Sequence, residues 1–241
     1  ELGNCFYINE NKQLVVGPDI PRINNLNEVP SPYLMGLFDH FFKERIWQPV
    51  LQTNRGCPYK CTFCDVPIKT HRRRDPKFVV DEMELCVKQG YEEIHFYDDL
   101  FNITPQRVMD ICDEIIKRGL KVVWDYRGRV NGIDEESIKR FKKSGGRMIS
   151  FGIETASEEG LIMMRKGSKV KQNIDALKLC RKYGITTIAD FSGIESTFLR
   201  EEITPHILMC RKLPDIVAIL SSLDLYQSLL VCRFGFAGNV S

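Results

Sequence analysis

The sequence predicts an α/β protein whose parallel strands form a partial (β/α)6 barrel, an open relative of the eight-stranded TIM barrel. From Val50 onward, short apolar runs alternate with amphipathic segments of helical period, as repeated βα units do. The chain has 241 residues, a usual length for one such barrel. Because crossovers between parallel strands are right-handed, six units curve into an incomplete barrel with reactive groups at the carboxyl ends of its strands.

Residues 1–49 contain several prolines and asparagines and show weak periodicity, so we expect an extended connector. The sequence opens without Met or an apolar signal region. We therefore expect this segment to be a linker or the end of a preceding domain.

The barrel itself is expected over residues 50–222. The predicted strands are Val50–Asn54, Ile94–Tyr97, Val122–Tyr126, Met148–Ile153, Thr186–Phe191 and Ile216–Leu220. The predicted helices are Val79–Gln89, Pro105–Arg118, Glu135–Ser144, Lys171–Tyr183 and Glu201–Lys212. Thr104 before Pro105 is a typical helix start, and Gly90, Gly119, Gly145 and Gly184 follow helices where a left-handed stop is expected.

Composition limits the partners and the compartment. The formal net charge is +2, with charges of both signs interspersed, which gives no argument for nucleic acid binding. No stretch approaches the roughly eighteen uncharged apolar residues that span a bilayer. Nine cysteines are spread through a long chain, and three of them fall within eight residues, which favours a reducing, cytoplasmic compartment and a metal site.

These three are Cys57, Cys61 and Cys64, in a loop after the first predicted strand. Thiolates suit iron-sulfur clusters and zinc, but a closed ferredoxin cluster or a structural zinc site needs four ligands. His71 is the only plausible local fourth ligand for zinc. The open hypotheses are therefore a cluster with one free iron, a ferredoxin-like electron carrier, and a zinc-stabilised binding module.

The C-x3-C-x2-C spacing, with an aromatic residue before the last cysteine, resembles the signature of the radical S-adenosylmethionine (SAM) superfamily. The likeness continues through His95–Asp99 and Phe151–Thr155 and is greatest to members with a cobalamin-binding domain. It implies a barrel of the radical SAM type, a 4Fe-4S cluster, SAM cleavage to a 5'-deoxyadenosyl radical, and an electron donor such as flavodoxin or ferredoxin. A small-molecule substrate would undergo methyl transfer or radical rearrangement.

The resemblance also implies roles for individual residues. Cys57, Cys61 and Cys64 match the cluster ligands, and Phe63 matches the aromatic residue near the adenine of SAM. The catalytic residues stay unknown, and because the cofactor carries the radical chemistry, the protein's task is to orient SAM and hold the substrate.

Further SAM contacts are expected at the ends of the next three strands. Asp98 and Asp99 could accept hydrogen bonds from the SAM amino group, or form a solvated turn. Arg129 is preferred to Arg127 as the partner of the SAM carboxylate. Glu154 matches a family residue that helps hold SAM, although a buried Glu paired with a neighbouring Arg would look the same in sequence.

Several features depart from the family pattern. Ser192–Thr197 replaces a Gly-Pro-Gly-Glu-Thr type of turn, and residues 223–241 lack an expected Pro-Gly turn, so this tail is divergent or truncated. No Asp-x-His-x-x-Gly segment offers a lower ligand to cobalamin, so cobalamin would bind through a domain outside this sequence. The basic run His71–Arg74 is typical of a solvated face, with contact to an anionic substrate as the alternative.

Overall fold

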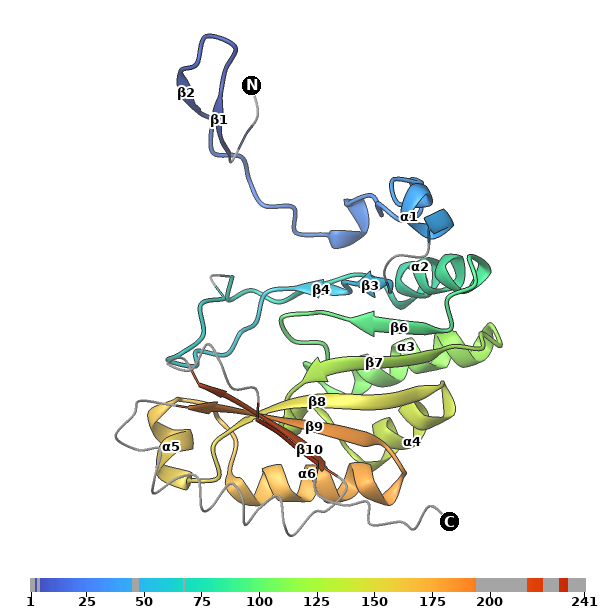
Figure 1. Cartoon of the computed structure of the whole chain (residues 1–241), viewed down its shortest axis with the longest axis vertical. Helices are drawn as coiled ribbons and strands as arrows, with labels where there is room; N and C mark the ends of the chain where they lie inside the picture. The colour runs from blue at the N-terminus through green and yellow to red at the C-terminus, as the bar shows by residue number, and fades with distance from the viewer. Residues whose placement is uncertain are drawn as a thin grey trace.

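A seven-stranded sheet forms the centre of the protein (Figure 1). The computed structural model describes residue 3 and residues 5–44, 48–66, 68–193, 216–222 and 230–233. The strand order is β11-β10-β9-β8-β7-β6-β3, and neighbours from β3 to β10 are parallel. The bounds are β3 Val50–Leu51, β6 Glu93–Phe96, β7 Val123–Gly128, β8 Gly146–Glu154, β9 Thr186–Gly193, β10 Ile216–Ser222 and β11 Leu230–Arg233. Six parallel strands in chain order confirm the predicted α/β architecture.

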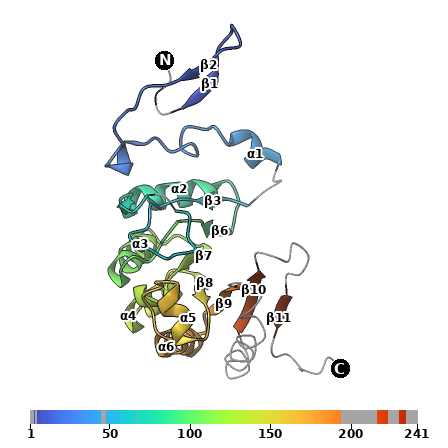
Figure 2. The ribbon, with the colours of Figure 1, turned by 90° about the vertical axis from the view of Figure 1, so that its left-hand side faces the viewer.

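The crossover helices lie together on one face of this sheet (Figures 1 and 2). They are α2 Pro76–Lys88, α3 Pro105–Lys117, α4 Glu135–Lys143 and α6 Val170–Lys182, and the shorter α5 Glu158–Met163 follows β8. Thr104 caps α3 as expected, because its side chain accepts a hydrogen bond from the Arg107 amide. No helix in the described ranges has the length and apolar content to cross a membrane.

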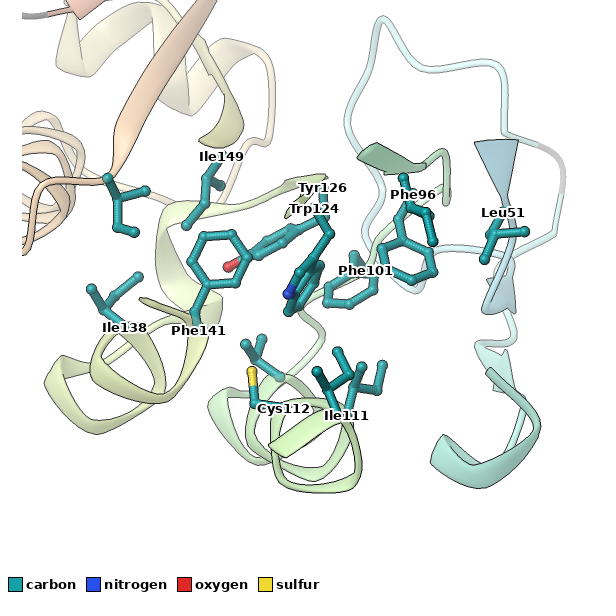
Figure 3. Packing of buried hydrophobic residues seen from close by; sticks show 14 of the residues in the cluster. Leu51, Phe96, Phe101, Ile111, Cys112, Trp124, Tyr126, Ile138, Phe141 and Ile149 are labelled. Atoms are coloured by element: carbon teal, nitrogen blue, oxygen red, sulfur yellow. The ribbon is translucent and has the colours of Figure 1, made fainter. Parts of the chain in front are cut away.

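Aromatic side chains fill the space between sheet and helices (Figure 3). On β7, Trp124 and Tyr126 point to this core, whereas the residues between and after them face the other side. The Trp124 ring packs edge-on against Phe141 of α4 with 4.6 Å between the ring centroids, and Phe101 stacks on Tyr126 with 4.5 Å between the centroids. The sheet therefore has one apolar face buried by helices and an opposite face that is free for polar side chains.

The segment expected to be a plain connector contains regular elements. β1 Phe6–Ile8 pairs antiparallel with β2 Leu14–Val16, and the short helices η1 Leu26–Glu28 and α1 Asp39–Glu44 follow. The Asn9 side chain closes the hairpin by accepting hydrogen bonds from two backbone amides within the turn. The periodicity misses this hairpin because it stands away from the sheet and buries little apolar surface (Figure 1).

Three other details differ from expectation or go beyond it. The predicted strand 50–54 is two pieces, β3 and β4 Asn54–Arg55, and β4 pairs antiparallel with β5 Arg72–Arg73. The chain leaves the sheet at Thr53 because the carboxylate of Asp98 binds it there. β11 lies within the tail 223–241 and pairs antiparallel with β10. The predicted helix 201–212 and most of Ser192–Thr197 fall outside the described residues.

Candidate functional site

A pocket of about 520 Å³ lies where the strands β6 to β9 end. Its wall includes all eight residues that the sequence singled out: Cys57, Cys61, Phe63, Cys64, Asp98, Asp99, Arg129 and Glu154. The carboxyl ends of parallel strands meet at one edge of a sheet, which explains how residues almost a hundred positions apart share one wall. The structure brings the predicted set together, and the role of each member stays a prediction.

The cysteine loop is held in a tight curve by its own backbone. The Cys57 amide donates to the Ile68 carbonyl at 3.0 Å, so the loop doubles back on itself. Gly56 has a φ of +86°, and a Cβ atom there would lie 2.2 Å from the Thr70 carbonyl oxygen. Any side chain at position 56 would therefore displace the loop that carries the three thiols.

Asp98 and Asp99 fasten this loop to β6. The Asp98 carboxylate accepts hydrogen bonds from the amide and hydroxyl of Thr53 at 2.7 and 2.6 Å, and from the amide and side chain of Asn54 at 3.1 and 2.8 Å. Burial raises the pKa of Asp98 to about 6, against the opposite effect of these donors. Asp99 accepts from the Gly56 amide at 2.7 Å. Both carboxylates thus support the loop directly, a role that the sequence did not suggest.

Arg129 lies beside the cysteines with unused hydrogen-bond donors. Its guanidinium stacks on the Tyr59 ring at 3.8 Å, and its Nη1 lies 3.5 Å from the Cys61 sulfur. Asn102 fixes its backbone, accepting from the Arg129 amide and donating to the Arg129 carbonyl. Nε and Nη2 are buried with no hydrogen-bond partner among the described residues. Such donors are costly to leave unsatisfied, so this position suits an anionic group of a ligand.

The electrostatic environments of the cysteines differ. Burial raises the pKa of Cys57, and a hydrogen bond from the Tyr59 backbone and the charge of Arg129 offset only part of that rise. Cys86 and Cys112 are buried in α2 and α3, where burial raises the pKa of each to about 12. A thiol so hard to ionise is a poor metal ligand. Of the seven cysteines whose side chains the structure describes, the three in the loop line the pocket.

The described residues form no ready-made site for a single metal ion. Among the described residues, no three His, Cys, Asp or Glu side chains converge on a point where one metal ion could be held. In a 4Fe-4S cluster each thiolate binds a different iron, so its ligands are spread around the cluster. His71, the proposed fourth zinc ligand, has its Nε2 3.2 Å from the Leu100 carbonyl and does not line the pocket.

Glu154 pairs with a lysine that the sequence did not bring to notice. The Lys166 Nζ lies 2.5 Å from Oε1 of Glu154, and both side chains are less than a tenth exposed. Lys166 also lies 5.6 Å from the Phe63 ring centroid. Glu154 has a φ of +67°, rare outside glycine, which turns its side chain into the pocket wall. The buried ion pair that the sequence left open as an alternative role for Glu154 thus exists, with Lys in place of Arg.

Tyr59, Asn102 and Lys166 were missed because each lies in a loop between the predicted elements. No periodicity or metal-ligand spacing marks such positions, although Tyr59 lies between two of the motif cysteines. The basic run His71–Arg74 is only in part the solvated face expected of it, because Arg73 is exposed whereas most of the Arg74 side chain is buried. Arg74 forms a buried pair with Glu82 at 2.6 Å, and none of its four residues lines the pocket.

Comparison with known proteins identifies a family model and several related enzymes. The family model of the radical SAM superfamily matches residues 51–202. An uncharacterized methyltransferase of Pyrococcus horikoshii is 30% identical over 96% of this chain, and the anaerobic magnesium-protoporphyrin IX monomethyl ester cyclase of Rubrivivax gelatinosus is 32% identical over 80%. The cobalamin-dependent radical SAM methyltransferase TokK of Streptomyces tokunonensis is 26% identical over 84%. The matches span 51%, 37% and 29% of these three relatives.

Solved structures agree on the fold. The cobalamin-dependent SAM radical enzyme OxsB, with aqua-cobalamin and SAM bound, covers 93% of this chain with a TM-score of 0.67 and 22% identity. The methyltransferase TsrM of Kitasatospora setae, with cobalamin and a 4Fe-4S cluster bound, covers 77% with a TM-score of 0.64 and 21% identity. The matches span 34% and 35% of those chains. The predicted barrel type and the likeness to cobalamin-dependent members are confirmed.

Proposed function

Since this chain belongs to the radical SAM superfamily, whose members use SAM and a 4Fe-4S cluster, we propose that Cys57, Cys61 and Cys64 hold the cluster and that SAM binds beside it. The observation that carries the proposal is Arg129, which presents two buried nitrogen atoms, Nε and Nη2, next to the Cys61 sulfur, with no hydrogen-bond partner among the described residues. The carboxylate of SAM is an anion of the size and geometry that a guanidinium fork binds.

The other wall residues divide the remaining work. Phe63 offers an apolar ring at the pocket wall for the adenine, and the Glu154 carboxylate lies where it can accept hydrogen bonds from SAM. Asp98 and Asp99 keep the cysteine loop in place through Thr53, Asn54 and Gly56, so their contact with SAM is secondary to that support. When bound, the cluster supplies the electron that cleaves SAM to methionine and a 5'-deoxyadenosyl radical.

We further propose that the reaction depends on cobalamin, and we favour methyl transfer over radical rearrangement. The support comes from the relatives, among which TokK and TsrM are methyltransferases and OxsB binds cobalamin. Cobalamin would bind through a domain outside this sequence, with residues 1–49 as the connector, 50–222 as the radical SAM core and 223–241 as a divergent tail. A small-molecule substrate, a flavodoxin or ferredoxin as electron donor, and a cytoplasmic location complete the proposal, because thiolate-held clusters need a reducing compartment.

The test is electron paramagnetic resonance of the anaerobically purified protein, reconstituted with iron and sulfide, reduced, and measured with and without SAM. We expect a reduced 4Fe-4S signal that shifts when SAM is added. Cys57→Ala should lose the signal, whereas Cys86→Ala should keep it, because Cys86 is buried in α2 away from the pocket wall.

The alternative hypotheses predict other outcomes. A cluster signal indifferent to SAM would mean an electron carrier, and a colourless protein with tightly bound zinc would mean a structural site. Either result would overturn the proposed function. Arg129→Gln adds a finer readout, because it should keep the cluster signal and weaken the response to SAM.

A further inference from the structure

A second group of polar side chains lies on the sheet face opposite the helices, next to the proposed SAM position. Tyr97 follows β6, Arg127 lies on β7 and Asp190 on β9, and all three line the 520 Å³ pocket. On β7, Arg127 alternates with the core residues Trp124 and Tyr126, so its side chain points away from the helices. Within the part of the chain that the structure describes, none of these three residues forms a hydrogen bond or ion pair with a cysteine of the loop.

Arg127 is held loosely, with most of its donors unused. Its Nη1 lies 3.4 Å from the Tyr97 hydroxyl and its Nη2 lies 3.4 Å from Oδ2 of Asp190, both near the upper limit for a hydrogen bond. A guanidinium has five N–H groups, so three have no hydrogen-bond partner among the described residues. The side chain is 50% exposed. It can therefore bind an oxyanion that enters the pocket.

Tyr97 adds an apolar surface beside this cation. Its residue surface is 63% exposed although it forms part of a pocket wall, and the Arg127 guanidinium lies 5.5 Å from its ring centroid. Tyrosine rings usually bury a large apolar area, so an open ring inside a pocket offers a face on which a flat organic group can stack. The ring and the guanidinium together present an aromatic face and an anion-binding fork.

Asp190 limits which anions this fork will hold. Its Oδ2 accepts from the Ser150 hydroxyl at 2.6 Å, which fixes the carboxylate beside Arg127. The fixed negative charge reduces the attraction of Arg127 for a small inorganic anion. A ligand that also stacks on Tyr97 recovers the difference, so the site favours an organic acid over free phosphate or sulfate.

Arg127 and Arg129 are therefore suited to different ligands. Arg129 is 7% exposed, lies against Tyr59 and contacts Cys61, whereas Arg127 lies two residues earlier, about 6–7 Å along the strand direction. Arg147 on β8 provides a contrast, because Glu93 closes its fork at 2.6 and 3.1 Å. Among these arginines, Arg127 is the one that combines exposure in the pocket with open donors.

We propose that Tyr97 and Arg127 form the substrate subsite, which takes an organic carboxylate attached to a flat, aromatic body. That the bound acid is the substrate rests on the proposed function. That an organic acid binds here rests on the geometry of these residues alone. Asp190 acts as a positioning residue that orients the guanidinium.

The probe is phenylacetate, compared with the neutral isostere phenylacetamide, titrated calorimetrically into the reconstituted protein with and without SAM. We expect saturable binding of phenylacetate that SAM does not compete away, and binding of phenylacetamide weaker by about tenfold or more. Arg127→Gln should weaken phenylacetate binding by about tenfold or more and keep the SAM-dependent resonance shift. Arg127→Lys should bind phenylacetate with an affinity between those of the wild type and Arg127→Gln, because it keeps the charge and loses the forked geometry of the guanidinium.

Arg147→Gln is the matched control, since this arginine is similarly exposed, at 42%, but its fork is already filled. It should leave phenylacetate binding unchanged. No saturable binding by the wild type, equal binding of the amide, or an Arg127→Gln variant that binds normally would each overturn the proposal. Loss of the SAM-dependent shift in Arg127→Gln would also overturn it, by assigning the residue to SAM. A wild type that binds phenylacetate but shows no response to SAM would instead refute the proposed function alone.

Discussion

The buried pair between Lys166 and Glu154 gives a sharp test of how burial sets the value of a salt bridge. We expect Lys166→Met to lower the free energy of unfolding by about 3–5 kcal/mol, because it removes the Lys166 cation from the buried Glu154 carboxylate. Methionine has a volume close to that of lysine, so little of this loss should come from a cavity. The measurement is urea unfolding of the protein without SAM.

Lys171 provides the control, because its Nζ lies at the same 2.5 Å from Asp175 but its side chain is 83% exposed. Lys171→Met should cost only a few tenths of a kcal/mol, as exposed pairs one helical turn apart do. The double variant Lys166→Met with Glu154→Gln should recover most of the loss, since two neutral groups then replace the ion pair. Equal effects of the two lysine substitutions, or no recovery in the double variant, would refute the reasoning.

Two further predictions concern stability. The pKa of Asp98 is raised from 3.8 to about 6 in the folded chain, so the fold gains a proton, and stability, as the pH falls through 6. The gain between pH 7.5 and pH 5 is about 1–2 kcal/mol, and urea unfolding at both pH values should show that Asp98→Asn removes it. An unchanged dependence of stability on pH in the variant would contradict the assignment. Phe101→Ala should lower the free energy of unfolding by about 3–5 kcal/mol because the ring is fully buried, while Phe63→Ala at the pocket wall should lower it far less. Comparable losses in the two variants would contradict the described core.

The barrel could be predicted because its signals are local and repeated. Each βα unit has an apolar strand, an amphipathic helix and a stop such as Gly145, whose φ is +95°. The N-terminal hairpin β1–β2 could not, since its order comes from side-chain contacts of Asn9 within the turn rather than from a buried face. Periodicity reports burial, so an element that buries little escapes it.

The candidate site was predictable to the extent that spacing carries chemistry. Three thiols at fixed intervals point to one cluster wherever the loop lies, so Cys57, Cys61 and Cys64 need no tertiary information. Asp98 required it. Two adjacent acids after a strand suggest a ligand site, and only the folded chain shows Thr53 and Asn54 converging on the first of them from a point more than forty residues away.

Arg127 and Arg129 show most directly where sequence reasoning stops. Both follow the aromatic core residues of one strand, both carry the same charge, and the alternation of side chains puts both on the same face. Their difference arises because β7 ends at Gly128 and Asn102 then fixes the backbone of Arg129, which turns that side chain in under Tyr59. Arg127 stays on the regular strand, open to the pocket. One strand end therefore separates a cation suited to the cofactor from a cation suited to the substrate.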